Sequence, residues 1–251
     1  GAAASAGAAS GGAFPDSLDI APIGTMRGRA VWAAAIPAPH AALDVPAGLV
    51  LIDWLACAAQ PDAGLTSVVA RAVAVMTWRR THRFCGACRT ELTEIEGAVG
   101  RTCPSCDSVT FAKAQPVALV AVWRRGASGP REVLLARHTY GAKHLWALVG
   151  GYVDPAESLE QAAHREVAEE VSLRVTELRY FGSEAWGLNG PGVLLAAYTA
   201  RSVDPDADAV VDGHELAEAH FFPVDALPDP IPPAHLIAGR ALSHLATLPY
   251  G

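Results

Sequence analysis

The sequence lacks the features that mark membrane-spanning, secreted and repeat proteins. It has no run of about 18 apolar residues, so no segment is predicted to cross a membrane. Residues 1–13 lack the basic start and apolar centre of a signal peptide, and we interpret them as a flexible leader. No internal repeat is detectable. These absences favour a cytoplasmic protein.

Basic residues are also scarce. The chain of 251 residues has 19 Lys and Arg against 26 Asp and Glu, a net charge of −7. A protein built mainly to bind nucleic acid usually has a basic surface, so this balance argues against that class without excluding a local basic patch. Hydrophobic residues make up 51% of the chain, which is enough for a buried core.

Cysteines are few, and four of the five occur in two paired motifs. Cys85-Gly-Ala-Cys88 is followed, after fourteen intervening residues, by Cys103-Pro-Ser-Cys106. Two such turns can supply four thiolates to one Zn²⁺, and a closed shell of four sulfurs is structural because it leaves no position for a substrate. A disulfide pair and a redox dithiol are the alternatives. We interpret Cys57, in an apolar segment without a nearby partner, as a buried inert thiol.

Apolar runs and helix signals alternate along the chain, which predicts an α/β (α+β) fold with a mixed sheet between helices. The boundaries predicted are a leader at 1–13, an N-terminal mixed α/β domain at 14–80, a zinc ribbon at 81–115 and a larger α/β/α domain at 116–251. Strands are predicted at 117–123, 132–137, 145–150, 192–200 and 219–222, with strands or short buried segments at 30–36 and 48–55. Helices are predicted at 68–80, 159–171 and 234–245, the first capped by Thr66-Ser67 with Ala70, Val73, Ala74 and Trp78 inward.

Glutamates crowd one face of the predicted helix at 159–171. Glu166 lies one helical turn from both Glu169 and Glu170, and three like charges on one face repel. A Mg²⁺ or Mn²⁺ ion would remove that penalty and could bridge to a substrate phosphate. The preceding Gly150-Gly151 pair allows close approach of the backbone to such a phosphate. A solvated acidic face is the alternative, and the three acids alone would favour it.

The complete pattern of Gly, Arg and Glu residues is more specific than the three acids alone. Gly151, five residues, Glu157, seven residues and then Arg165-Glu166-Val167-x-Glu169-Glu170 resembles the Nudix box of the Nudix hydrolases. That family has Gly where this chain has Ser172. The helix is therefore expected to leave its last turn without the residue that most easily takes the left-handed conformation.

The order of the predicted domains resembles one Nudix subgroup, the NADH pyrophosphatase family. The join into the ribbon, His82-Arg83-Phe84-Cys85-Gly86-x-Cys88, is similar as well. The resemblance implies cleavage of NAD(H) at its pyrophosphate into a nicotinamide mononucleotide and AMP, with removal of NAD caps from RNA in some members. It also implies Mg²⁺ or Mn²⁺ as cofactor and a homodimer.

Site residues follow from the same resemblance. It implies a metal site on the three glutamates completed by a fourth from a distant loop, an aromatic ring stacked on the substrate, and backbone offered after Pro232-Pro233. The corresponding residues here are Glu166, Glu169, Glu170 and Glu215 for the metal, Tyr152 for the ring and Ala238 for the backbone. Arg165 is expected to orient the acids. Either Glu170 or Glu169 is expected to accept the proton of the attacking water.

The chain departs from this subgroup in its specificity loop. The family has Ser-Gln-Pro-Trp-Pro-Phe-Pro-x-Ser, whereas residues 183–191 keep only Ser183 and Trp186, place Glu184 where Gln stands, and contain two fewer prolines. Phe111-Ala112-Lys113 likewise replaces Tyr-Pro-Arg. These changes predict a substrate related to NAD but altered, with Ser183, Glu184, Trp186 and Gly151 among its contacts.

Two other functions fit the sequence less well. One is a Nudix hydrolase of ADP-ribose or another nucleoside diphosphate compound. The other is a non-catalytic sensor that uses the ribbon to contact nucleic acid or protein. The net charge and the intact set of glutamates argue against a sensor, which has no need of clustered acids.

Overall fold

A computed structural model describes residues 19–35, 54–60, 62–126, 130–187, 192–211 and 213–248. No helix in these ranges is long and apolar enough to cross a membrane. The predicted leader at 1–13, most of the predicted segment at 48–55 and positions 188–191 of the specificity loop lie outside the described residues.

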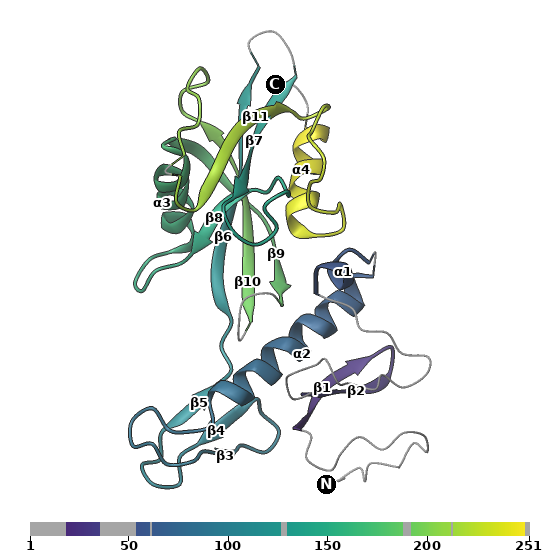
Figure 1. Cartoon of the computed structure of the whole chain (residues 1–251), viewed down its shortest axis with the longest axis vertical. Helices are drawn as coiled ribbons and strands as arrows, with labels where there is room; N and C mark the ends of the chain where they lie inside the picture. The colour runs from purple at the N-terminus through teal and green to yellow at the C-terminus, as the bar shows by residue number, and fades with distance from the viewer. Residues whose placement is uncertain are drawn as a thin grey trace.

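A hairpin and a long helix open the described chain (Figure 1). Strands β1 (Ile20–Met26) and β2 (Arg29–Ala34) pair antiparallel, and helices α1 (Trp54–Ala58) and α2 (Ala63–Thr81) follow. A small antiparallel sheet comes next, made of β3 (Thr93–Glu94), β4 (Gly100–Thr102) and β5 (Val109–Phe111). Helix α2 packs on the hairpin through a core of Ala21, Ile23 and Val75.

The second half is built on a mixed sheet, in which six described strands take part. They are β6 (Gln115–Arg125), β7 (Arg131–His138), β8 (Val149–Tyr152), β9 (Val175–Trp186), β10 (Val193–Ser202) and β11 (Leu216–Pro223). The order is β11-β7-β6-β10-β9, with β8 also paired to β6. Strands β6 and β10 run parallel, and the other pairs are antiparallel.

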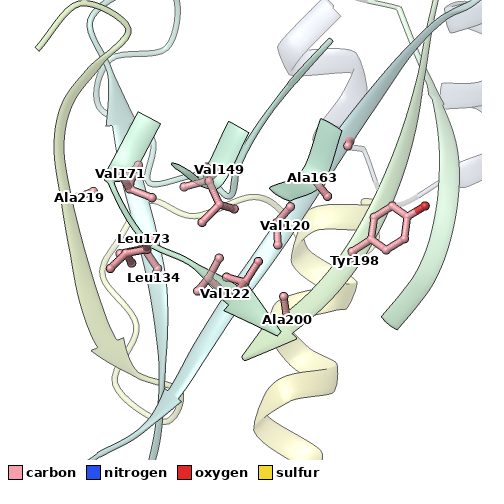
Figure 2. Close-up of a cluster of buried hydrophobic side chains, with 14 of the residues drawn as sticks. Val120, Val122, Leu134, Val149, Ala163, Val171, Leu173, Tyr198, Ala200 and Ala219 are labelled. Atoms are coloured by element: carbon pink, nitrogen blue, oxygen red, sulfur yellow. The ribbon is translucent and has the colours of Figure 1, made fainter. Parts of the chain in front are cut away.

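Helices α3 (Leu159–Val171) and α4 (Ile237–Thr247) lie on opposite faces of this sheet (Figure 1). Alternate side chains of β6 point to the two faces of the sheet. Val120 and Val122 join the cluster that includes Val171 of α3 (Figure 2), whereas Ala121 joins the one that includes Leu242 of α4. A strand buried on both sides carries apolar residues without alternation, which explains the continuous run from Val117 to Trp123. The predicted fold class is confirmed.

Helix α3 has the limits that the sequence predicts. Its N-cap is Ser158, whose hydroxyl accepts the N–H of Gln161 at 3.1 Å, while the Gln161 side chain accepts the N–H of Ser158 at 2.7 Å. Both halves of the capping box are present, so the start of the helix is fixed by local chemistry. At the other end Ser172 takes the left-handed conformation, with φ 56° and ψ 26°.

Replacing Ser172 by glycine is expected to stabilise the protein by about 1 kcal/mol, because a side chain in this conformation carries a steric penalty that glycine avoids. Urea unfolding would measure the change. Ser243→Gly is the matched control, since Ser243 lies exposed inside α4. That variant is expected to lose about 1 kcal/mol. A loss in both variants would contradict the prediction.

Two expectations for α2 are wrong. The helix begins at Ala63 and not after Thr66-Ser67, because Asp62 caps it by accepting the N–H of Leu65 at 3.1 Å. The Thr66 hydroxyl instead donates to the carbonyl of Asp62 inside the helix. Of the residues predicted to face inward, Val73 is exposed, and Val75 is buried in its place.

The sheet differs from prediction at two strands. Strand β8 begins at Val149 and not at 145, because the chain before it forms a turn in which the N–H of Leu145 donates to the carbonyl of Ala142. The sequence does not predict strand β9. Its outer position leaves a mixture of exposed and half-buried side chains, including Tyr180, so no clear apolar alternation marks it.

Candidate active site and metal centre

Arg165 organises the acidic face of α3. Its guanidinium forms a fork with Glu157, with Nε–Oε1 at 2.9 Å and Nη2–Oε2 at 2.8 Å. Nη1 donates to Glu166 at 2.7 Å and to Glu169 at 3.0 Å, and Nη2 also donates to the backbone carbonyl of Tyr152. One cation therefore orients two predicted metal-binding acids and ties α3 to β8. The motif includes Glu157, but its role as the anchor of Arg165 is visible only in the structure.

The glycine pair in β8 lets the strand pass directly against these acids. A Cβ on Gly151 would lie 2.4 Å from the carboxyl carbon of Glu166, and one on Gly150 would lie 2.0 Å from the carbonyl oxygen of Ala118. The N–H of Gly150 donates to Glu170 Oε2 at 3.2 Å. A side chain at Gly150 would meet backbone, where the φ of 154° is also unfavourable, whereas one at Gly151 would displace only the Glu166 carboxylate. The pair therefore lets this carboxylate keep its place where the sheet meets the acidic helix face.

The electrostatics of the acids differ according to their partners. Burial raises the pKa of Glu166, and Arg165 offsets part of that shift. The hydrogen bonds from Arg165 lower the pKa of Glu157. A buried carboxylate with a raised pKa carries an unfavourable charge at neutral pH, and a bound cation would relieve it. This donor set of oxygens suits a hard divalent cation.

Glu215 approaches the same region from the loop before β11. Thr139, after β7, donates its N–H to the Glu215 carbonyl at 2.9 Å. The charge of Glu215 also contributes to the raised pKa of Glu166, which indicates that the two carboxylates lie near each other. Among the described residues, only the four paired cysteines bring three or more ligand atoms within 4.8 Å. Among the described residues, no three of the predicted metal-binding carboxylates therefore offer oxygens that close together.

The predicted substrate contacts lie at one end of the sheet. Tyr152 pairs with Val117, Val117 with Leu195, and Leu195 with Glu184, so the first and last stand in one row across four strands. Three strand spacings separate them by about 14 Å. Side chains directly opposite each other share a face. Tyr152 is 45% exposed on that face.

Ser183 and Trp186 belong to the same strand as Glu184. Ser183 is exposed and lies on the other face of β9, while Trp186 closes the strand opposite Val193 and is half-buried. The register thus groups Trp186 with Glu184 and leaves Ser183 pointing away from both. Their contacts with a substrate remain predictions.

The carboxylate of Glu184 contacts other residues of the protein. Its Oε2 accepts the N–H of Ile237 at 2.5 Å and lies 3.5 Å from Arg240. The N-cap residue of α4, Leu236, offers no side-chain hydrogen bond, so the carboxylate takes over the capping of that helix. The helix accordingly begins at Ile237 and not at the predicted position 234. Ala238, predicted to offer its backbone to a substrate, is the next residue, so Glu184 positions it whether or not it touches a ligand.

The four paired cysteines converge at the tip of the ribbon. Sulfur–sulfur distances are 3.4 Å for Cys88 to Cys103 and 3.6 Å for Cys85 to Cys106 and for Cys88 to Cys106. A tetrahedral ion with metal–sulfur bonds of about 2.3 Å requires about 3.8 Å between sulfurs. A disulfide requires about 2.05 Å. The spacing fits a shared metal ion and not a disulfide. Hydrogen bonding at Thr90 lowers the pKa of Cys88 to about 6, whereas burial raises the pKa of Cys103 to about 11, so a bound metal would have to displace the proton of Cys103.

Arg101 joins the ribbon to α2. Lying in β4 with 9% exposure, it donates to the carbonyls of Arg79 and His82 at 3.0 and 2.7 Å, at the end of the helix. Its guanidinium also lies over the ring of Trp78, 5.6 Å from the centroid. A cation at a helix C-terminus satisfies carbonyls that have no partner within the helix. The order of the ribbon is thereby coupled to that of α2.

The sequence of this chain is similar to those of known proteins. The family model of the NUDIX domain matches residues 114–244. The NAD-capped RNA hydrolase NudC of Deinococcus radiodurans is 35% identical over 206 residues, covering 82% of this chain and 71% of that protein. The protein of the same name from Chromobacterium violaceum is 37% identical over 196 residues, covering 76% of this chain and 70% of that protein.

Similar solved structures include a NUDIX hydrolase from Nitrosomonas europaea. It is 25% identical, with 58% of this chain and 80% of that chain covered and a TM-score of 0.46. The family assignment rests on the sequence matches, since the domain match spans more than half of the chain and both relatives are matched over more than two thirds of their length. The chain belongs to the Nudix family of diphosphatases.

Proposed function

We propose that the protein hydrolyses the diphosphate of NAD(H), or of a modified NAD-like dinucleotide, into two mononucleotides, one of them AMP. The observation that carries this proposal is the match to relatives named NAD-capped RNA hydrolase over most of both chains. The arrangement on α3 supports it, because a diphosphate is an anion that needs a cation to approach clustered carboxylates.

The proposed catalytic cofactor is Mg²⁺ or Mn²⁺, held by Glu166, Glu169, Glu170 and Glu215. When bound, such an ion supplies neutralisation of phosphate charge and lowers the pKa of a water. Arg165 holds Glu166 and Glu169 in position. Glu169 or Glu170 accepts the proton of the attacking water. Glu170 keeps a backbone partner at Gly150, whereas Glu169 is 61% exposed and more open to solvent.

The specificity loop supports a substrate other than unmodified NAD(H). Where the NADH pyrophosphatase family has Gln, this chain has Glu184, and its carboxylate is committed to the N-terminus of α4. A side chain bound in this way is less available to a ligand. The ring-binding end of the site is therefore proposed to accept an altered nicotinamide half, with Tyr152 and Trp186 as its aromatic contacts.

Several further properties are proposed with this function. The cysteine cluster holds a structural Zn²⁺, since its sulfur spacing suits that ion. The chain divides into a leader at 1–13, an N-terminal domain at 14–80, a ribbon at 81–115 and a catalytic domain at 116–251, and it acts as a cytoplasmic homodimer. NAD-capped RNA is the second candidate substrate, favoured by the names of the relatives.

Product analysis by mass spectrometry tests the proposal. The purified protein is incubated with Mg²⁺ or Mn²⁺ and with NADH, NAD, ADP-ribose, a nicotinamide-modified NAD, a nucleotide sugar or NAD-capped RNA. We expect AMP from the dinucleotides, with faster turnover of the modified one than of NAD. Equal or slower turnover of the modified dinucleotide would contradict the altered-substrate proposal. Cleavage of ADP-ribose alone would contradict the dinucleotide proposal.

A further inference from the structure

Tyr140 lies beside the candidate active site and belongs to neither the core nor the Nudix box. Its ring leans on the imidazole of His138, at the end of β7, with centroids 5.2 Å apart and planes tilted by 46°. Burial lowers the pKa of His138, which favours a neutral imidazole as the support. Tyr140 nevertheless remains 55% exposed. A ring held from one side and open on the other can contact a ligand.

Hydrogen bonds on the preceding residue fix Tyr140 relative to Glu215. Thr139 donates its N–H to the Glu215 carbonyl at 2.9 Å and its hydroxyl to the His214 carbonyl at 2.7 Å. These bonds join the chain leaving β7 to the chain entering β11, directly beyond the pair His138–Leu216. Tyr140 therefore directly follows the residue that holds the backbone of Glu215 in place.

The acids of the predicted site influence the phenol. Burial raises the pKa of Tyr140, and the charges of Glu215, Glu170 and Glu166, together with Tyr152, raise it further. The neighbouring residue Thr139 holds the carbonyl of Glu215, so Tyr140 lies beside the loop that carries this acid. The phenol of an ordinary tyrosine is protonated at neutral pH and can donate a hydrogen bond.

We infer that Tyr140 positions the substrate, its hydroxyl donating a hydrogen bond to a non-bridging oxygen of the diphosphate while His138 supports its ring. The inference rests on the proposed diphosphate hydrolysis and adds a contact from outside the Nudix box. Because phosphate oxygens reach the glutamates only through a cation, we expect the diphosphate to lie beside Glu215, whose carbonyl the residue before Tyr140 holds. Anionic oxygens accept strong hydrogen bonds from neutral donors.

Tyr140→Phe isolates the hydroxyl, because it leaves the ring in place on His138. With Mn²⁺ and whichever of NADH, NAD and ADP-ribose is cleaved fastest, KM is expected to rise about tenfold or more while kcat changes less than about threefold. Tyr180→Phe is the matched control, since Tyr180 is 60% exposed on β9. Its kinetics are expected to stay within about twofold of the wild type. An unchanged KM in Tyr140→Phe would overturn the inference.

A binding measurement separates this inference from the proposed substrate. ADP-ribose is titrated into the wild type and Tyr140→Phe with Ca²⁺ in place of Mn²⁺, since carboxylates also bind Ca²⁺. About tenfold weaker binding by the variant supports the contact even if NAD(H) is not cleaved. Equal affinity, or the absence of binding to both proteins, overturns it. Cleavage of ADP-ribose without cleavage of NADH would instead contradict the proposed dinucleotide substrate and leave the tyrosine comparison intact.

Discussion

Glu170→Gln is expected to lower kcat about a thousandfold or more while the protein remains folded. Glu170 is 5% exposed and accepts the N–H of Gly150, and the oxygen of an amide can keep that hydrogen bond. The substitution removes a negative charge and a proton acceptor from the acidic face of α3. Turnover with Mg²⁺ or Mn²⁺, measured beside a thermal melt, checks both halves of the prediction.

Glu160→Gln is the control for that experiment. Glu160 stands in the first turn of the same helix, exposed, with its carboxylate accepting from the Tyr198 hydroxyl at 3.2 Å. The same chemical change there is expected to alter kcat by less than about twofold. If Glu170→Gln retained near-normal turnover, Glu170 would be neither the base nor a required metal ligand.

Cys103→Ala is expected to release the bound Zn²⁺ and to lower the melting temperature by about 10 °C or more. Cys103 is 1% exposed, and its sulfur lies 3.4 Å from that of Cys88, so its loss opens the proposed shell. The effect is expected to reach α2, because Arg101 in β4 donates to the carbonyls at the end of that helix. Metal content by plasma mass spectrometry and thermal unfolding measure the two effects.

Cys57→Ala provides the matched control. Cys57 is 5% exposed in α1 and does not belong to the cluster of four sulfurs. This variant is expected to keep its full zinc content and to lose only about 1 kcal/mol of stability. Full zinc content and an unchanged melting temperature in Cys103→Ala would show that the cysteine cluster does not hold the metal.

The elements that could be predicted closely are those whose limits depend on neighbouring residues. Ser158 and Gln161 form the capping box at the start of α3. The helical spacing of the glutamates predicts that the helix continues as far as the residue before Ser172, which is its C-cap. The four cysteines could be grouped for the same reason, because each C-x-x-C turn brings its own pair of sulfurs together. Local chemistry leaves few alternatives in such segments.

The sequence predicts a wrong helix start where two local capping signals compete. It misses a strand where tertiary contacts determine the structure. Both Asp62 and the Thr66-Ser67 pair could cap α2, and only the folded backbone shows that Asp62 does so. Strand β9 lacks apolar alternation because it lies at the edge of the sheet and presents Tyr180 to solvent. Its existence follows from pairing with β10, which no pattern within β9 reveals.

The sequence motif names the residues of the candidate site but not their partners. The motif names Arg165, yet its bidentate pairing with Glu157 requires the turn that folds 154–157 back onto α3. The placement of Tyr140 depends on the pairing of β7 with β11, two strands that are far apart in the sequence and adjacent in the sheet. Contacts between distant segments are set by topology, and no spacing rule within one segment predicts them.

The hydrogen bond from Ile237 to Glu184 has a consequence for protein engineering. A loop graft that replaces 183–191 with the family sequence would put a neutral amide where a carboxylate now faces the N-terminus of α4, and would leave Arg240 without its acid. The graft would therefore destabilise α4, although it changes no residue of that helix. A chimera designed to exchange substrate preference should transfer 183–191 and 232–240 together, as a single module.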